Sequence, residues 1–225
     1  MAKHGKKYTD IAKKAPTEVL PLEEAIKFLK ANPVAKFDET MEIAFRMGCN
    51  PKQQTIRGTV NLPNGTGKKV RVLVFAQGTA ADAAREAGAD YVGLDDLLEK
   101  IKGGWLDFDV AIATPDAMAA VRKMARVLGP RGLMPNPRTG TVTEDTAAAV
   151  KASKAGKVEF RMNQQAAICV PFGKASFEVP ALVENAMAIR DAIVAERPAA
   201  VKGQYIRRVT VSSTMGVGIR VTIKE

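Results

Sequence analysis

The spacing of apolar residues changes character twice along this chain of 225 residues. Near both ends, apolar and polar residues alternate, which is typical of strands with one buried face. In the middle, short apolar runs are followed by segments of helical periodicity, which is typical of parallel strands covered by helices. The sequence therefore predicts an α/β protein with two domains. A discontinuous α+β domain is formed by both chain ends, 1–66 plus 157–225, and an inserted Rossmann-like α/β domain with a parallel sheet spans 67–156.

Three strand–helix units follow one another in the inserted segment. Thr79 is the expected N-cap of the first helix, and Thr114 with Pro115 marks the start of the third. Consecutive units of this kind build a parallel sheet with helices packed on it. The expected strands are 70–75, 91–93 and 109–113, and the expected helices are 80–87, 95–101 and 115–128.

Strands dominate the outer segments, which carry two expected helices, 22–30 and 180–195. The last two strands are expected to form a hairpin, and 166–171 is expected to pair with 158–162. The expected strands are 41–45, 56–62, 158–162, 166–171, 206–212 and 217–223.

Positive charge is in excess and is unevenly distributed. Lys and Arg number 34 against 24 Asp and Glu, a net charge of +10. The insert holds 13 against 11, whereas the outer segments hold 21 against 13, a net of +8. This balance predicts a polyanionic partner, either nucleic acid or an anionic membrane surface. A nucleic acid would bind mainly to the outer domain. The membrane alternative lacks the strongly amphipathic basic helix that it needs, and no apolar run reaches 18 residues.

The sequence contains few of the residue patterns that enzymes use for catalysis. His4 is the only histidine, which argues against a histidine zinc site, a Ser-His-Asp triad and a Cys-His protease. Cys49 and Cys169 are too few and too far apart for a disulfide framework, which fits a reducing cytosol. We expect both to be small core residues. Residues 65–69 (GTGKK) partly match a phosphate loop but lack its first glycine and the hydroxyl after the lysine. We expect no enzyme, no metal and no cofactor; the alternative, a nucleotide-binding enzyme domain, requires saturable nucleotide binding by 67–156.

Two polar segments are unusual for an ordinary surface. Residues 36–40 (KFDET) place an aromatic ring between a lysine and a hydroxyl, and residues 212–216 (SSTMG) combine hydroxyls, a thioether and a glycine. Hydroxyls can bond phosphate or ribose, apolar side chains can pack on a sugar, and glycine allows close approach. An ordinary turn is the alternative reading. Aromatic residues make up only 5% of the chain, so a basic surface for helical RNA is favoured over base stacking.

Long motifs carry a resemblance that covers nearly the whole chain. Residues 126–137 (RVLGPRGLMPNP) resemble the signature of the L-one family of large-subunit ribosomal proteins, in its bacterial branch. Further matching segments are 3–8 (KHGKKY), 35–40 (AKFDET), 57–60 (RGTV), 87–93 (AGADYVG), 113–116 (ATPD), 173–177 (GKASF) and 214–216 (TMG).

The resemblance implies a non-enzymatic protein with two domains joined by a hinge. Members bind a helix-and-loop region of 23S rRNA, form the mobile stalk beside the exit site and contact deacylated tRNA as it leaves. Bacterial members also bind a mimic of this site in their own operon mRNA and repress its translation. The expected partners are therefore the rRNA stalk helices, exit-site tRNA and the operon mRNA, with no membrane. The expected location is the ribosome in the cytoplasm, with a monomer outside it.

The resemblance also places the principal RNA surface in the first domain, in agreement with the charge there. Lys174 and Arg161 are added from charge and position on flanking strands. Arg208 is added from charge alone, because a charge on its strand should face the same surface. Residues 129–132 either touch RNA secondarily or form a structural loop. The residues carried over from the resemblance as rRNA- and mRNA-binding are Lys36, Phe37, Glu39, Thr40, Thr214, Met215 and Gly216.

Overall fold

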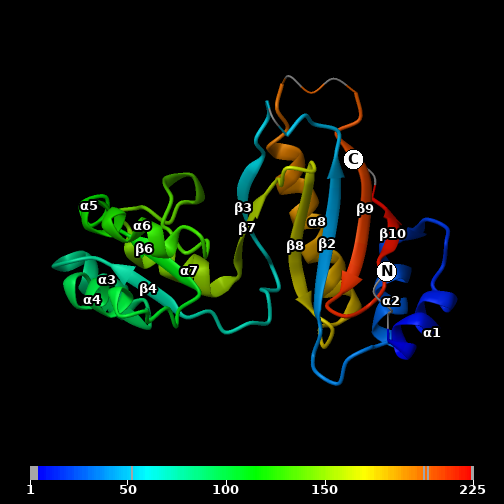
Figure 1. Cartoon of the computed structure of the whole chain (residues 1–225), viewed down its shortest axis with the longest axis horizontal. Helices are drawn as coiled ribbons and strands as arrows, with labels where there is room; N and C mark the ends of the chain where they lie inside the picture. The colour runs from blue at the N-terminus through cyan, green and yellow to red at the C-terminus, as the bar shows by residue number, and fades with distance from the viewer. Residues whose placement is uncertain (1–4, 52, 200, 202, 224–225) are drawn as a thin grey trace. The chain divides into compact units, whose positions relative to one another are not determined.

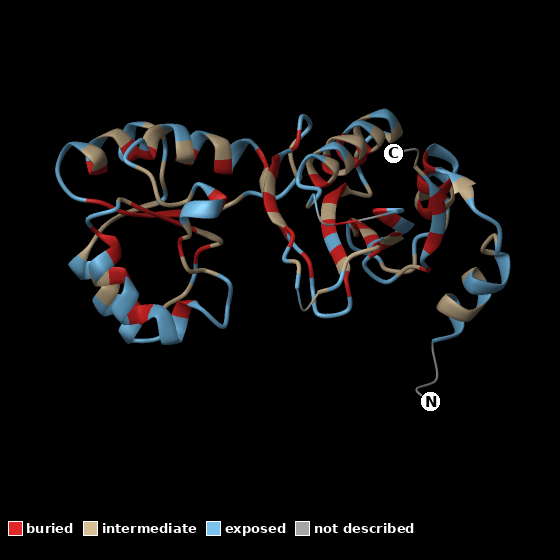
Figure 2. Ribbon diagram, turned by 90° about the horizontal axis from the view of Figure 1, so that it is seen from above, coloured by how far each residue is buried: buried red, intermediate tan, exposed pale blue. Residues whose placement is uncertain are grey.

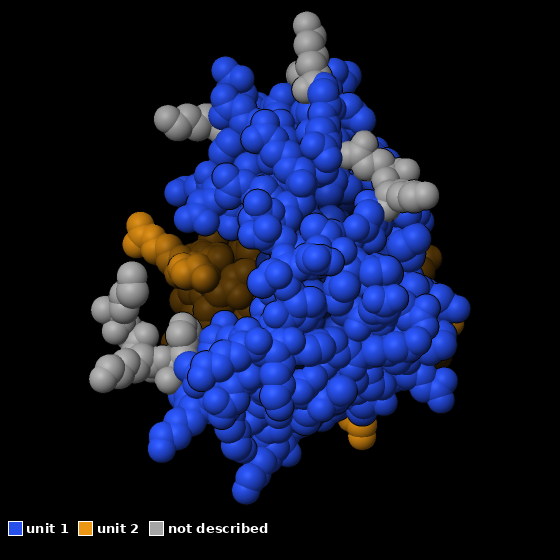
Figure 3. Space-filling model, turned by 90° about the vertical axis from the view of Figure 1, so that its right-hand side faces the viewer, with its two compact units in different colours: residues 1–67, 158–225 blue, residues 68–157 orange. Residues whose placement is uncertain are grey.

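The chain separates into two compact units of mixed α/β structure, each with its own sheet. The computed structural model describes residues 5–51, 53–199, 201 and 203–223, so that His4 lies outside the described residues. Unit 1 consists of Met1–Gly67 and Val158–Glu225, and unit 2 of Lys68–Lys157 (Figures 1 and 3).

A five-stranded sheet organises unit 1. Its order is β1-β10-β9-β2-β8, with β1 parallel to β10 and the remaining neighbours antiparallel. Two further strands, β3 (Arg57–Asn61) and β7 (Lys157–Arg161), form a separate two-stranded sheet. The strands of the large sheet are β1 (Leu20–Pro21), β2 (Thr40–Met47), β8 (Ala167–Lys174), β9 (Ile206–Ser213) and β10 (Ile219–Thr222).

Helices α2 (Leu22–Ala31) and α8 (Val179–Ala195) share one core with the large sheet, and α8 lies behind its strands in Figure 1. Alternation explains which face is covered: in β2, every second residue from Met41 to Met47 is buried. Figure 2 colours the buried residues of the chain red. A short polar helix, α1 (Lys6–Lys14), adds Tyr8 and Ile11 to the edge of this core.

The opposite side of the sheet is exposed or half-buried, and we call it the open face. The register places its residues in rows across β8, β2, β9 and β10. The open face consists of Ala167, Cys169, Pro171 and Lys174 on β8, Thr40, Glu42, Ala44 and Arg46 on β2, Arg208, Thr210 and Ser212 on β9, and Arg220 and Thr222 on β10.

Unit 2 contains the parallel sheet that the sequence predicts, and its strand order is β5-β4-β6. Every residue of β4 is buried because helices cover both faces. Val72 and Val74 pack toward α3 and α7, and Leu73 and Phe75 pack toward α4, α5 and α6. The elements are β4 (Val72–Phe75), α3 (Thr79–Glu86), β5 (Tyr91–Gly93), α4 (Asp95–Lys102), β6 (Val110–Ala113), α5 (Met118–Val121), the 3-10 turn η1 (Arg122–Met124), α6 (Ala125–Leu128), the 3-10 turn η2 (Pro137–Thr139) and α7 (Thr146–Ala155).

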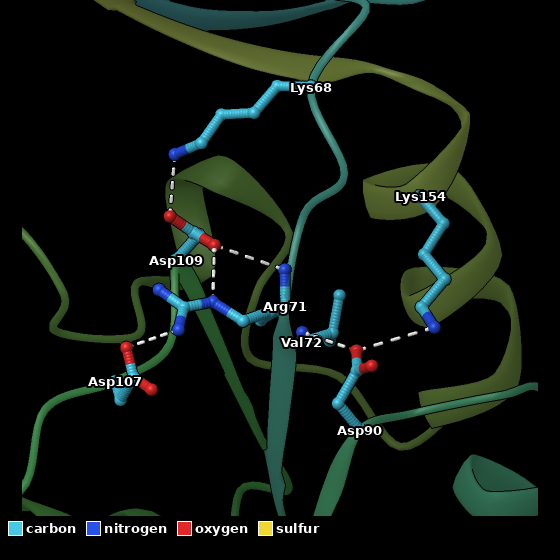
Figure 4. Close-up of polar contacts among 7 residues, drawn as sticks. All are labelled: Lys68, Arg71, Val72, Asp90, Asp107, Asp109 and Lys154. Carbon is cyan, nitrogen blue, oxygen red and sulfur yellow. Dashed lines mark hydrogen bonds and ion pairs between the residues drawn. The ribbon is translucent and has the colours of Figure 1, made fainter.

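Ion pairs hold the amino ends of these parallel strands together (Figure 4). Asp109 accepts hydrogen bonds from Lys68 Nζ at 2.6 Å and from Arg71 N and Nε at 3.1 and 3.2 Å. Arg71 also binds Asp107, and Asp90 accepts from Val72 N at 2.9 Å. Partial burial opposes ionisation of Asp109, but its bonds to Lys68 and Arg71 outweigh that effect and lower its pKa to about 2.

We expect Asp109→Asn to destabilise unit 2 by about 1–2 kcal/mol at pH 7, after allowance for solvent screening. The folded-state pKa lies below the ordinary value of 3.8, so this stabilisation is present above pH 4 and is lost as the pH falls toward 2. Trp105, the only tryptophan, lies in unit 2 and reports its unfolding in urea. A difference between variant and wild type that does not shrink between pH 5 and pH 3 would contradict this assignment.

Several local predictions are wrong. Gly78 rather than Thr79 is the N-cap residue of α3. The helix expected over 115–128 begins at Met118 and is interrupted by η1, although Thr114 Oγ1 does accept a hydrogen bond from Ala117 N at 3.4 Å. Segment 158–162 does not pair with 166–171: β7 pairs with β3, and β8 pairs with β2.

Cys169 is also misplaced by the sequence reading, because strand alternation puts it on the open face between two buried neighbours. Cys49 is half-buried. Helices α1 and α7 were not predicted. None of the described helices is long and apolar enough to cross a membrane.

Candidate nucleic-acid interface

The two unusual polar segments meet at one end of the open face. Because β2 begins where its antiparallel neighbour β9 ends, Met41 pairs with Ser213 and the flanking loops become neighbours. Thr40 N donates to Thr214 Oγ1 at 2.9 Å, and that hydroxyl donates to Thr40 O at 3.3 Å. Residues 174 positions apart are thus joined by two hydrogen bonds.

Glu39 ties these loops together from within. It is only 2% exposed, and its carboxylate accepts hydrogen bonds from Val34 N at 3.1 Å, Ala35 N at 2.7 Å and Met215 N at 3.5 Å. Burial raises its pKa, but the neighbouring Ser213 hydroxyl and these backbone amides outweigh that effect and lower the pKa below 4.5. Glu39 is therefore a charged, inward-facing residue that holds the two loops together by hydrogen bonds, and we call it the buried brace.

The loop after β8 forms the third side of this arrangement. Lys174 Nζ donates to Thr40 Oγ1 at 2.9 Å, and Ala175 N donates to Glu39 O at 2.8 Å. Ser176 donates from its backbone N and its hydroxyl to the Asp38 carboxylate at 3.0 and 2.9 Å. Lys174 is accordingly half-buried, with its ammonium group placed between two loops.

Lys36, Phe37, Thr214 and Met215 remain exposed above this bonded base. The side chains of Phe37 and Met215 are 58% and 54% exposed, unusually high for large apolar groups. A Cβ at Gly216 would lie 2.3 Å from the buried Ser213 Oγ, so a larger residue there would force that hydroxyl to move. We define the interface cluster as Lys36, Phe37, Glu39, Thr40, Lys174, Thr214, Met215 and Gly216.

The two remaining predicted residues lie outside the interface cluster. Arg161 is exposed on β7, in the separate two-stranded sheet. Arg208 is on the open face, but six residues before Thr214 on β9, about 20 Å away at the usual strand rise. Sequence reasoning missed Asp38 and Ser176, although both belong to motifs that it singled out. It also missed Arg46, which gave no signal beyond its charge.

Unit 2 presents a cavity and a basic segment. The cavity, of about 410 Å³, lies at the carboxyl ends of the parallel strands, where Thr79, Thr114, Asp116 and Glu144 line it without a cation. Two carboxylates and no lining cation make this a poor phosphate site. The described residues contain no cluster that could hold a metal ion. Five exposed cations lie between Asp116 and Glu144 with no acid among them: Arg122, Lys123, Arg126, Arg131 and Arg138.

Comparison with known proteins identifies the family. The model of the ribosomal protein L1p/L10e family matches residues 29–217. The chain is 56% identical to the large ribosomal subunit protein uL1 of Lactobacillus acidophilus over 223 residues, 98% of this chain and 97% of that protein. The proteins of the same name from Lactobacillus gasseri and Lactobacillus johnsonii are 55% and 54% identical, each across 97% of this chain and 96% of theirs. The chain therefore belongs to the ribosomal protein L1p/L10e family, a family of ribosomal proteins and not of enzymes.

Proposed function

We propose that this chain is a structural constituent of the large ribosomal subunit that binds 23S rRNA through the open face and interface cluster of unit 1. The observation that carries the proposal is the convergence of the two loops around Glu39 and Thr40, with Phe37 and Met215 exposed above them. Exposed apolar side chains beside hydroxyls and a lysine suit a sugar–phosphate surface.

The open face supports the same function. Its centre carries small side chains, among them Ala44, Thr210 and Ser212, and cations lie at both ends. Small groups let a polynucleotide backbone approach the sheet, while Lys or Arg groups neutralise its phosphates. Glu42 is the single carboxylate on this face. We assign unit 1 as the RNA-binding domain and unit 2 as an inserted Rossmann-like domain.

The finer steps of the proposal are those that the family resemblance implies, and the positive charge on part of unit 2 supports one of them. On the ribosome in the cytoplasm, the bound chain forms the mobile stalk beside the exit site and assists release of deacylated tRNA. The acid-free segment from Arg122 to Arg138 is the surface that we assign to the tRNA. Off the ribosome, the monomer binds its own operon mRNA at the same unit 1 surface and represses translation. Competition between stalk rRNA and the operon leader for one protein tests that shared surface.

We expect Thr214→Ala and Met215→Ala each to weaken binding of a stalk RNA fragment by about 1–3 kcal/mol, by analogy with lost base contacts. Thr214→Ala loses the hydroxyl that bonds Thr40, and Met215→Ala loses an exposed apolar contact. Filter binding or calorimetry measures the change, and thermal unfolding reports the fold.

Val19→Ala is the matched control, because Val19 is 56% exposed on unit 1 but lies outside the interface cluster. It should bind like wild type. Unchanged affinity in both Thr214→Ala and Met215→Ala would remove this loop from the site.

A further inference from the structure

Three arginines gather at the end of the open face that lies away from the interface cluster. Arg46 on β2 is directly opposite Arg208 on β9. The register then shifts, so that the next residue, Met47, pairs with Ile206 and leaves Arg207 as the extra residue of a bulge. Both Arg207 and Arg208 are exposed, between the buried residues Ile206 and Val209. The bulge thus adds a third exposed arginine next to the opposed pair, and the Nε atom of Arg207 lies toward Gly48, two residues after Arg46.

Nothing in the described structure neutralises these charges. Neither Arg46, Arg207 nor Arg208 belongs to an ion pair among the residues that the structure describes. Glu42, the one carboxylate on the open face, is four residues before Arg46 on β2, about 13 Å away at the strand rise, and accepts from Cys169 Sγ instead. Like charges directly opposite each other destabilise a sheet. An arrangement of this kind is unfavourable unless an anion binds to it.

We propose that Arg46, Arg207 and Arg208 form a second phosphate-binding subsite, which grips the RNA backbone about 20 Å along β9 from the Thr214 loop. The inference rests on the proposed RNA binding and adds a position and a role to it. Guanidinium groups bind phosphate oxygens in a bidentate manner, so the subsite takes backbone phosphates without reading base sequence. It fixes where the RNA lies across the open face, and the interface cluster supplies the selective contacts.

The test compares Arg46→Gln/Arg208→Gln with Lys13→Gln/Lys14→Gln, which removes the same charge from exposed positions on α1. Each protein is titrated with a stalk RNA fragment and a scrambled hairpin at several salt concentrations. For the arginine variant we expect at least a tenfold loss of affinity at 0.1 M salt, and a slope of log affinity against log salt that is smaller by about 1.4–1.8, since each of the two lost phosphate contacts removes about 0.7–0.9. The control variant should keep the wild-type slope.

Thermal unfolding separates binding from a structural role. Removing two opposed positive charges should leave the melting temperature unchanged or raise it, whereas a structural pair would lose stability along with affinity. A slope and affinity equal to those of the lysine control overturn the subsite, and so does a melting temperature that falls in step with affinity. Equal binding of stalk and scrambled RNA by wild type overturns the proposed function instead; the slope comparison still decides whether the arginines hold phosphate.

Discussion

Replacing Glu39 with Gln is expected to weaken stalk RNA binding at least 30-fold and to lower the stability of unit 1 by about 2–4 kcal/mol. The carboxylate is buried and accepts hydrogen bonds from three backbone amides on two loops. A glutamine must turn a donor toward one of those amides, which leaves a buried N–H unsatisfied. With the loops no longer held, only a fraction of the molecules present the binding conformation, and the apparent affinity falls by that fraction.

Glu42→Gln is the matched control, because Glu42 lies three residues after Glu39, on β2, and its carboxylate accepts a hydrogen bond from Cys169 Sγ rather than from the loop amides. It removes one negative charge from the open face, so stalk RNA should bind as tightly as to wild type or more tightly. Affinity and thermal stability are measured on both variants. If Glu39→Gln retained the wild-type affinity and melting temperature, the buried brace would have no role in the interface.

Replacing Asn185 with Leu is expected to destabilise unit 1 by about 3–5 kcal/mol, lowering its melting temperature by roughly 10–15 °C. Asn185 is fully buried on α8. Its Oδ1 accepts from Asn64 N at 3.1 Å, while Nδ2 donates to Gly65 O at 3.0 Å and Phe172 O at 2.9 Å. Leucine fills nearly the same volume but leaves all three backbone groups unpaired. The backbone amides of residues 62–67, at the end of the first part of unit 1, should also exchange their hydrogens faster.

Circular dichroism and hydrogen exchange over 62–67 measure these effects, and Trp105 fluorescence shows whether unit 2 is disturbed. Asn64→Ala is the control, since its side chain bonds the exposed Glu184 and the carbonyl of Ala181 at the surface. It should cost less than about 1 kcal/mol. A melting temperature for Asn185→Leu within 3 °C of wild type would show that α8 does not anchor this segment.

Periodicity sufficed for the elements with clear apolar stripes. Apolar and polar residues alternate in β2 and β9, which predicts strands with one buried face. The unbroken apolar run of β4 predicts a strand that is buried on both faces. Helix α7 escaped prediction because its packed side contains Thr146 and Ser153 beside Val150. Those hydroxyls are buried with bonds to Ala80 O and Ala149 O at 2.7 and 2.8 Å, a solution that the apolar pattern does not reveal.

The sequence also did not predict which strands pair when they are far apart along the chain. Adjacent strands favour a hairpin, so 158–162 was matched with 166–171, whereas β8 pairs along its length with β2. The site shows the same limit. The loops of the interface cluster could be named from their residues, but the burial of Glu39 depends on Met215, 176 positions away. The pairing of Arg46 with Arg208 likewise depends on the register between β2 and β9, which the sequence does not reveal.

The measurement that tests the central claim most directly is the affinity of the purified chain for a stalk fragment of 23S rRNA and for a scrambled hairpin, over a range of salt concentrations. We expect tight binding that favours the stalk fragment at every salt concentration, with affinity for both RNAs falling as salt rises because counterions are released. Equal affinity for the two RNAs, with the same dependence on salt, would contradict the claim and leave only the non-specific attraction of a basic protein.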